Sequence, residues 1–529
     1  MIERRMFRAQ ASGQLVAISA LHVGSSGDGL VVDMEQSRDG RGQLIIPGTT
    51  ITGALRAALE QWQGTPGTDW WGRLERASTI TIDDAVATEP VRLAVRDSVS
   101  IDRISGAAAY GQLFSRDVVS AGTRFSFGLT INSPDRATSE SLMKRIVGVL
   151  QGPGIWLGAA TTGGLGHVRL ENASPRLLDF TSPSGLRAAV LGGGHPIDIA
   201  VIDHAGPRPG HLRITIPWRP VGPVMSRVSV KGATTDSFPL HATDSQGSVR
   251  LLLPGSSIKG SLRSHAEYIV RTVVNRDAPL DFRSQMRAEG LSGIGELFGL
   301  AGEKQKSTGE KQKSTNSGRR GALTVHDTLT SVQLPSREWN ALRVAEGSDE
   351  PGAQNQEEHK RFATAIDNLN TKVAGQGLWF DFAVRNAVDR WSGGAAELFA
   401  AVEPYAARVG VWDPIVVELD VARLLRAKAT VDTALALLLL VLRDLVQGGV
   451  PIGFGTTRGL GSISVSAEDV RFDAGDDVAA RSATVGRLRG RTLADIGADE
   501  KLLIDLTEVW QSTTNQENGA TTNQENGAT

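Results

Sequence analysis

One motif is written twice in this chain. "IIPGTTITGALR" occupies residues 45 to 56, and "LLPGSSIKGSLR" occupies residues 252 to 263. Four further pairs of segments follow in the same order along the two halves, and the spacing between partners grows from 207 residues (45 to 252) to 295 residues (157 to 452). Collinear order with growing spacing indicates a duplicated domain whose second copy has gained insertions. The chain therefore has to build one architecture twice.

The further pairs locate the insertions. They are DWWG at 69–72 with ELFG at 296–299, TITIDDA at 79–85 with ALTVHDT at 322–328, SIDRISGAAAYGQLF at 100–114 with AIDNLNTKVAGQGLW at 365–379, and LGAATTGGLGHVRL at 157–170 with IGFGTTRGLGSISV at 452–465. This pairing predicts an extra helix near residues 394–409 and a loop over residues 331–358. A tandem of GEKQKST at 302–315 cannot bury apolar surface, so residues 300–320 are predicted to be disordered or loop.

The order of elements is the same in both copies. A strand runs into the Pro-Gly turn, hydroxyl residues then start a helix, two strands and a second helix follow, and a glycine-rich loop leads into a last strand. This β-α-β-β-α-β order is the split pattern of ferredoxin-like domains. The sequence therefore predicts an α+β fold of two tandem ferredoxin-like domains with inserted hairpins and loops.

The length of 529 residues is too great for one hydrophobic core. We predict a first domain over residues 1–190, a linker over 191–208 and a second domain over 209–475. A helical extension over 476–510 and a disordered tail over 511–529, which contains a second tandem repeat, are expected to follow.

Composition excludes several classes of protein. The chain has no cysteine, which removes disulfides, thiolate metal sites and cysteine nucleophiles and fits a cytoplasmic location. Its formal charge is −2, so a nucleic-acid partner needs a local basic surface. No signal peptide is apparent, and "ALALLLLVL" at 434–442 is too short to span a bilayer, so it is predicted to be a buried helix and no membrane partner is expected.

The start of the helix after each Pro-Gly turn is a possible anion site. Free backbone N–H groups and the helix dipole favour negative charge there, and Lys259 and Arg263 in copy two, or Arg56 in copy one, follow about one turn later. The alternative is a capped helix with solvated basic residues.

The glycine-rich loops "GAATTGGLG" and "GFGTTRGLG" lack the ending of a nucleotide-triphosphate loop. Their glycines allow close approach of the backbone to another group, and Thr161, Thr162, Thr456, Thr457 and Arg458 offer donors. Packing of a tight turn explains these glycines equally well.

Taken together, the strand-PGSSxKGxLR-helix, the "IDRxSGxAxxGxLF" segment and the late glycine-rich loop resemble the RAMP superfamily, specifically the backbone subunits of type III CRISPR effector complexes, twice over between about residues 10 and 470. The resemblance implies that the helix starts and glycine-rich loops bind the guide RNA and that the IDR-type segment forms a thumb hairpin. The residues so assigned are Thr49, Thr50, Arg56, Ser256, Ser257, Lys259, Arg263, Gly158, Thr161, Thr162, Gly164, Gly166, Gly453, Thr456, Thr457, Arg458, Gly459 and Gly461. Copy one has Thr52 where copy two has Lys259, so its phosphate contact is expected to be weaker.

The same resemblance implies cleavage of complementary target RNA by an aspartate in the loop before each Pro-Gly turn, assisted by Mg²⁺ or Mn²⁺. Asp33 and Asp236 match that position, with Asp39 and Asp244 as second acidic residues. A carboxylate can hold a hydrated cation or orient the RNA 2′-hydroxyl for in-line attack. The alternative is that these aspartates only shape surface turns, as Asp28 between two glycines is expected to do.

Other polar residues near these motifs are expected to be structural. Asp84, Asp327, Asp102 and Asp367 are placed at the ends of matched strands and are predicted to cap turns or pair with arginines. The histidines show no zinc-ligand spacing. His22 is expected to be a satisfied strand residue, with acid-base work as the alternative, and His265 is placed to meet RNA or a neighbouring subunit.

The function that the resemblance implies is a guide-RNA-binding, target-cleaving backbone subunit of an antiviral ribonucleoprotein. Its implied partners are guide RNA, complementary target RNA, other RAMP backbone subunits, a small subunit and a large polymerase-like or cyclase-like subunit. Three alternatives stay open at this point: a passive RNA scaffold, a metal-independent endonuclease that processes guide precursors, and a ferredoxin-like tandem that binds only proteins.

Overall fold

The computed structural model describes residues 6–25, 32–63, 69–199, 206–228, 235–288, 290–302, 318–345, 356–426 and 431–525. The chain divides into two compact units. The first unit comprises residues 1–96, 115–210 and 244–246, and the second comprises 97–114, 211–243 and 247–529. The two units do not coincide with the two predicted domains, because residues 97–114 of the first repeat group with the second unit.

The first unit contains a four-stranded antiparallel core sheet. Its strands are β1 (Phe7–Ala17), β3 (Ile80–Ile82), β7 (Arg124–Ser133) and β9 (His167–Asp179), in the order β9-β1-β7-β3, with β10 (His195–Pro196) added beyond β9. Helix α1 (Gly48–Gln63) follows β1 in the chain, and α2 (Arg136–Gln151) connects β7 to β9. This is the order and connectivity of a ferredoxin-like domain.

The second unit repeats the arrangement. Strands β11 (His211–Ile216), β17 (Leu323–Val325), β21 (Ile415–Asp420) and β23 (Arg471–Ala474) pair in the order β17-β21-β11-β23, extended by β24 (Arg491–Thr492). Helices α4 (Gly255–Val273) and α10 (Val431–Val446) occupy the places of α1 and α2. The predicted tandem ferredoxin-like fold is confirmed.

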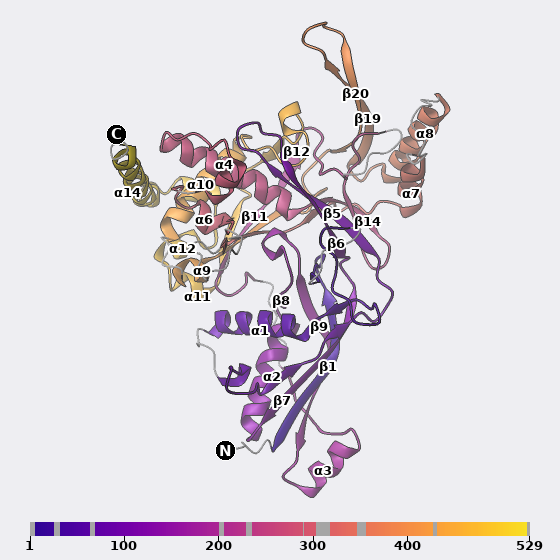
Figure 1. The fold of residues 1–529 in the computed structure, drawn as a ribbon, viewed down its shortest axis with the longest axis vertical. Coiled ribbons are helices and arrows are strands. Elements are labelled where there is room, and N and C mark those ends of the chain that lie inside the picture. Colours follow the sequence, from indigo (N-terminus) through magenta and orange to yellow (C-terminus); the bar gives the residue numbers. More distant parts are fainter. Residues whose placement is uncertain are drawn as a thin grey trace, which may run out of the picture. The chain divides into compact units, whose positions relative to one another are not determined.

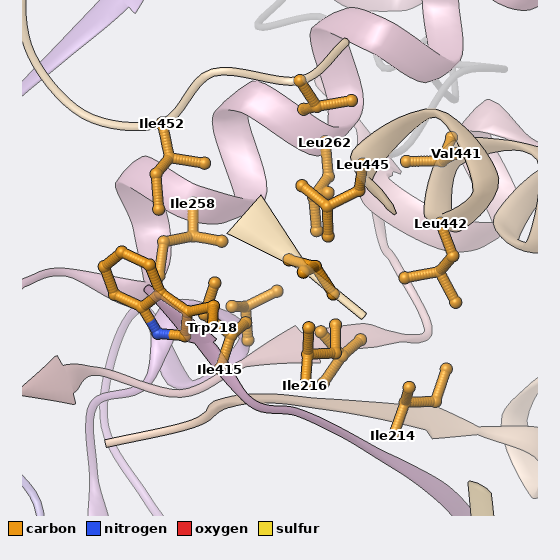
Figure 2. Packing of buried hydrophobic residues seen from close by; sticks show 14 of the residues in the cluster. Ile214, Ile216, Trp218, Ile258, Leu262, Ile415, Val441, Leu442, Leu445 and Ile452 are labelled. Atoms are coloured by element: carbon orange, nitrogen blue, oxygen red, sulfur yellow. The ribbon is translucent and has the colours of Figure 1, made fainter. Parts of the chain in front are cut away.

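Apolar residues at strand and helix periodicity build the core of the second unit. The side chains of α4 and α10 point toward those of β11 and β21 in Figure 2, among them Ile258, Leu262, Val441, Leu442, Leu445, Ile214, Ile216 and Ile415. The apolar run at 434–442 therefore lies in a buried helix, as predicted. Each helix in the described part of the chain is too short or too polar to cross a membrane.

Each repeat carries a long inserted hairpin. The first pairs β5 (Leu93–Ile101) with β6 (Ala108–Val119), and the second pairs β19 (Leu378–Val388) with β20 (Ala395–Ala406), drawn in orange in Figure 1. The predicted extra helix near residues 394–409 is therefore wrong, because these residues form β20. Their alanines and glutamates favour helix locally, but a continuous ladder to β19 satisfies the backbone instead.

The predicted loop over residues 331–358 is also wrong in part. It contains α7 (Ser336–Ala345), which packs against α8 (Gln356–Val373), and Trp339 of α7 and Phe362 of α8 are both buried. Residues 365–373 lie in α8 and not in a hairpin, so the sequence pairing of 100–114 with 365–379 is wrong. The predicted disordered repeat lies mostly outside the described residues, since residues 303–317 are not described.

The C-terminal part is helical, with α11 (Asp476–Ala479), α12 (Ala483–Leu488), α13 (Leu493–Gly497) and α14 (Glu500–Glu525). Helix α14 runs through residues 511–525, where the sequence predicts a disordered tail. Thr513 and Thr514 donate their hydroxyls to the carbonyls of Val509 and Trp510, and α14 packs against α10. The polar residues 511–525, whose composition predicts a disordered tail, therefore belong to a helix.

Shorter elements connect these parts. They are β2 (Ile45–Ile46), β4 (Ala85–Val86), β8 (Ile155–Trp156), α3 (Pro183–Val190), β12 (Trp218–Pro220), β13 (His241–Thr243), β14 (Val249–Leu253), α5 (Phe282–Arg287), α6 (Ile294–Phe298), β15 (Gly299–Leu300), β16 (Arg319–Arg320), β18 (Thr328–Leu329), α9 (Val421–Arg426) and β22 (Ile463–Val465), with single 3₁₀ turns η1 (Asp69–Trp71), η2 (Thr161–Gly163) and η3 (Thr456–Arg458).

Candidate RNA-binding and cleavage sites

Asp33 lies beside the second strand of the first hairpin. The backbone N–H and the hydroxyl of Ser115 donate to Asp33 Oδ2 over 2.7 Å and 3.1 Å, and Met34 forms a parallel bridge with Arg116. The carboxylate is exposed, and the hydrogen bond from the Ser115 backbone, followed by that from its hydroxyl, holds the pKa of Asp33 below its ordinary value. The structure thus presents an ionised carboxylate at the base of this hairpin.

Asp236 occupies the same place in the second repeat. The backbone N–H of Ala400 in β20 donates to Asp236 Oδ2 over 3.0 Å, and Ser237 forms a parallel bridge with Ala401. The backbone of Met34 donates to the Ser115 carbonyl, as that of Ser237 does to the Ala400 carbonyl, both over 3.2 Å. The two aspartates, assigned from the family resemblance, are structural equivalents.

The neighbouring acidic residues serve as turn residues. Asp39 accepts hydrogen bonds from the backbone N–H groups of Arg41 and Gln43, and Asp244 accepts one from Gln246. Asp28 lies outside the described residues. Among the residues that the structure describes, no three His, Asp or Glu side chains come together as a metal-binding group. Asp33 and Asp236 would each offer carboxylate oxygen to a cation there, which is the type of ligand that Mg²⁺ and Mn²⁺ prefer.

The start of each Pro-Gly helix is capped by an aspartate from the loop after a distant strand. The backbone N–H of Gly48 donates to Asp84 over 2.7 Å, and that of Gly255 donates to Asp327 over 2.9 Å. A Cβ at either glycine would lie 2.2 Å or 2.1 Å from the carbonyl oxygen of Ile82 or Val325. The structural role expected of Asp84 and Asp327 is confirmed, and one donor of each predicted anion site is already engaged.

The side chains assigned to guide RNA differ in exposure. Thr49, Arg56 and Ser256 are exposed, and Thr50 and Ser257 are half-buried. Lys259 Nζ instead donates to the carbonyl of Leu323 over 2.7 Å, and burial, with Arg320 and Arg263 nearby, lowers the pKa of Lys259 to about 7. Thr52, its counterpart in copy one, donates to the Gly48 carbonyl. The amine expected to hold phosphate therefore faces the protein.

The glycine-rich loops have the same backbone in both repeats. Gly158, Gly164 and Gly166 have φ values of +82°, +95° and +88°, and their counterparts Gly453, Gly459 and Gly461 have +88°, +83° and +84°. The N–H of Ala159 bonds to the His22 carbonyl, and that of Phe454 bonds to the Met225 carbonyl. The close approach expected of these glycines is thus to the protein's own backbone.

The donors on these loops are distributed unevenly. Thr161 is buried and Thr162 and Thr456 are half-buried, whereas Thr457 and Arg458 are exposed. The guanidinium carbons of Arg227 and Arg458 lie 5.0 Å and 4.7 Å from the ring centroid of Phe454. Two arginines around one aromatic ring can stack on a nucleobase and pair with phosphate. Sequence reasoning missed Arg227 and Phe454, because only the fold brings residues 227 and 454 together.

Both histidines singled out in the sequence have protein partners. His22 is buried, its Nδ1 lies 2.6 Å from the Asp117 carbonyl oxygen, and burial lowers its pKa. His265 Nε2 lies 2.7 Å from Asp444 Oδ2. The satisfied role expected of His22 is confirmed. Asp102 caps its own turn through Ser105, as expected, whereas Asp367 lies within α8 and ends no strand.

Two ferredoxin-like domains in one chain, each with a long hairpin and a loop aspartate held by the second strand of that hairpin, define a tandem-repeat α+β protein. A family model described as the RAMP superfamily matches residues 14–169 and 239–464, one region in each repeat. The chain belongs to the RAMP superfamily.

Two relatives are similar to parts of the chain. It is 25% identical over 185 residues to the CRISPR system Cms endoribonuclease Csm3 of Methanocaldococcus jannaschii. The match covers 29% of this chain and 75% of that protein. It is 33% identical over 110 residues to the CRISPR system Cms protein Csm5 of Enterococcus italicus, covering 21% of this chain and 28% of that protein. The similarity points to the type III CRISPR branch of the superfamily.

Proposed function

We propose that this chain is a guide-RNA-binding backbone subunit of a type III CRISPR effector complex and that it cleaves complementary target RNA at two sites. The observation that carries the proposal is the equivalent placement of Asp33 and Asp236, each held through Oδ2 by the second strand of a long hairpin. Two purely conformational turn residues would not need to share a partner so distant in sequence. The name of the Csm3 relative, an endoribonuclease, supports the same conclusion.

The proposed chemistry uses the RNA's own nucleophile. The carboxylate of Asp33 or Asp236 accepts a hydrogen bond from a 2′-hydroxyl and orients its oxygen for in-line attack on the adjacent phosphate. The carboxylate takes up the 2′-hydroxyl proton as the 2′-oxygen bonds to phosphorus, the P–O5′ bond breaks, and water protonates the departing 5′-oxygen, leaving a 2′,3′-cyclic phosphate and a 5′-hydroxyl. Because the pKa of Asp33 is lowered, this carboxylate is ionised and able to accept the bond at neutral pH.

Dependence on Mg²⁺ or Mn²⁺ is a separate part of the proposal. Asp33 and Asp236 would supply the protein's oxygen ligands to such an ion, which would stabilise the charge on the phosphate during cleavage. Loss of cleavage in EDTA would support the metal, and unchanged cleavage would leave the aspartates acting alone.

Guide binding is proposed to use the exposed donors of both repeats. Thr49, Arg56 and Ser256 lie on the Pro-Gly helices, and Thr457 and Arg458 lie on the second glycine-rich loop. The amine of Lys259 donates to the Leu323 carbonyl, so Lys259 is expected to support the position of α4. It would contact RNA only if RNA binding moved this amine outward. The proposed partners are guide RNA, target RNA, and the backbone, small and large subunits of such a complex.

Target cleavage by the assembled complex tests the proposal. Asp33→Asn and Asp236→Asn keep the shape of the side chain and remove the negative charge. Each is expected to slow cleavage at one set of target positions by about 10²-fold or more, while cleavage at the other set persists. Asp39→Asn and Asp244→Asn are matched controls from the same loops and should cut normally. If a complex with the double variant still cleaves the target, these aspartates do not catalyse the cleavage, and the chain would act as a passive RNA scaffold.

A further inference from the structure

The backbone beside the two loop aspartates follows the same course in both repeats. The N–H of Asp117 in β6 donates to the Met34 carbonyl over 3.0 Å, and the N–H of Val402 in β20 donates to the Ser237 carbonyl over 3.1 Å. Met34 directly follows the first aspartate in the chain, and Ser237 directly follows the second. Asp117 of the first repeat therefore has the place that Val402 has in the second.

A further pair of hydrogen bonds extends this match along both loops. The N–H of Ser37 donates to the Val23 carbonyl over 2.7 Å. In the second repeat the N–H of Leu240 donates to the Ser226 carbonyl over 2.7 Å. In each case the matched residues are 203 positions apart (37 to 240, 23 to 226), as the two loop aspartates are. The two sites can therefore be compared residue by residue.

The side chains at the matched positions around the aspartates differ in chemistry. Those of the first repeat are polar or charged, and they are His22, Glu35, Gln36, Arg116 and Asp117. Those of the second repeat are apolar, and they are Met225, Phe238, Pro239, Ala401 and Val402. At these positions the first site therefore offers groups that can exchange protons, and the second site offers none.

Asp117 is the proton-exchanging group that β6 places nearest to the residue that holds Asp33. It lies two residues after Ser115, so the two side chains leave the same face of the strand about 7 Å apart. Its carbonyl oxygen lies 2.6 Å from His22 Nδ1 and accepts a hydrogen bond of 3.1 Å from Gln36 Nε2. These bonds use the backbone of Asp117, so they fix the strand without engaging the carboxyl group.

The surroundings of Asp117 favour its protonated form. The carboxyl group is half-buried, and burial, followed by the negative charge of Glu35, raises its pKa, while Arg38 and His22 act in the opposite direction. The pKa of Asp33 is instead lowered by its hydrogen bonds. Two carboxyl groups whose surroundings move their pKa values apart can divide the roles of acid and base.

We propose that in the first repeat Asp117, in place of water, protonates the departing 5′-oxygen while Asp33 takes up the 2′-hydroxyl proton. This role of Asp117 rests on the proposed function. As the P–O5′ bond breaks, the Asp117 O–H bond breaks and its proton passes to the 5′-oxygen, so Asp117 becomes a carboxylate and Asp33 a carboxylic acid. Proton exchange with water restores both groups. Because Val402 has this place in the second repeat, water remains the proton donor there.

Target RNA with sulfur in place of the 5′-bridging oxygen tests this role, because a thiolate departs without a proton donor. In the assembled complex, Asp117→Asn is expected to slow the Asp33-dependent cuts in ordinary RNA by about 10²-fold or more and to leave the Asp236-dependent cuts unchanged. In the sulfur-containing RNA the deficit of Asp117→Asn is expected to disappear. Asp33→Asn should stay slow on both RNAs, since the 2′-hydroxyl still has to be activated.

The matched control is Asp97→Asn, which changes an exposed aspartate in β5 of the same hairpin and should cut both RNAs normally. The Asp236-dependent cuts report in the same tube that the variant chain has folded and assembled. Normal cutting by Asp117→Asn, or an equal deficit on both RNAs, would overturn the role of Asp117 while the Asp33-dependent cuts still support the proposed function. Cuts that depend on neither Asp33 nor Asp236 would instead overturn the proposed function itself.

Discussion

The backbone N–H of Ser115 donates a hydrogen bond of 2.7 Å to Asp33 Oδ2, and 82 residues separate the two in the chain. The Ser115 hydroxyl adds a second bond of 3.1 Å to the same oxygen. In the other repeat Ala400 supplies only its N–H to Asp236. The second strand of each hairpin thereby holds the aspartate of its own repeat, and Ser115 adds its hydroxyl in the first repeat.

Ser115→Ala should raise the pKa of Asp33 toward its ordinary value without fully restoring it, because the stronger backbone bond remains. Since a lowered pKa means that folding favours the carboxylate, the stability that it supplies is present above the unfolded pKa and is lost as pH falls through the folded pKa. Carboxyl-carbon NMR titration measures the change. Ser105→Ala is the matched control, and it should raise the pKa of Asp102 and leave Asp33 as it was.

Glu267→Gln should destabilise the protein far more than Glu60→Gln. Glu267 is buried and pairs with Arg103 and Arg263, so its loss leaves two arginines short of a partner and costs about 3–5 kcal/mol. Glu60 forms an exposed pair with Arg56, which contributes about 0–1 kcal/mol. Urea unfolding of the two variants gives the comparison, and similar midpoints would contradict it.

Stability should rise with pH through the range set by Lys259. Burial lowers its pKa from 10.5 to about 7 in the folded protein, so between these values the unfolded chain binds more protons than the folded one. Below pH 7, folding therefore carries the whole free-energy cost of burying the charged Lys259 amine. This cost decreases as pH rises toward 10.5. Lys259→Met should flatten this part of the Tm profile, and an unchanged slope would contradict the buried placement.

Gly158→Ala and Gly453→Ala should each disrupt a glycine-rich loop. A Cβ there would lie 2.1 Å from the His22 carbonyl oxygen or 2.4 Å from that of Met225, besides the positive φ. Gly459→Ala is the control, because its φ is also positive at +83° but no atom lies within 4 Å, so only the backbone cost of about 1–2 kcal/mol applies. Thermal unfolding should rank Gly459→Ala as the mildest of the three.

Much of the fold could be predicted from the sequence because most motifs occur in both repeats, and each copy supports the assignment of the other. The Pro-Gly helix starts, the glycine-rich loops and the loop aspartates recur at matched positions, and the structure superimposes their hydrogen bonds as well. The hairpin was the exception. The matching hairpin tips are DRISG at 102–106 and DRWSG at 389–393, whereas residues 365–373 of the predicted partner segment lie in α8.

The sequence by itself determined that two ferredoxin-like domains form and where their turns and helix starts lie, because turn chemistry and periodicity act over a few residues. Only the tertiary structure decided that residues 395–406 form a strand, that Lys259 turns inward and that Arg103 reaches Glu267. Strand pairing, burial and ion pairing depend on residues far apart in the chain, and local preference carries no information about them.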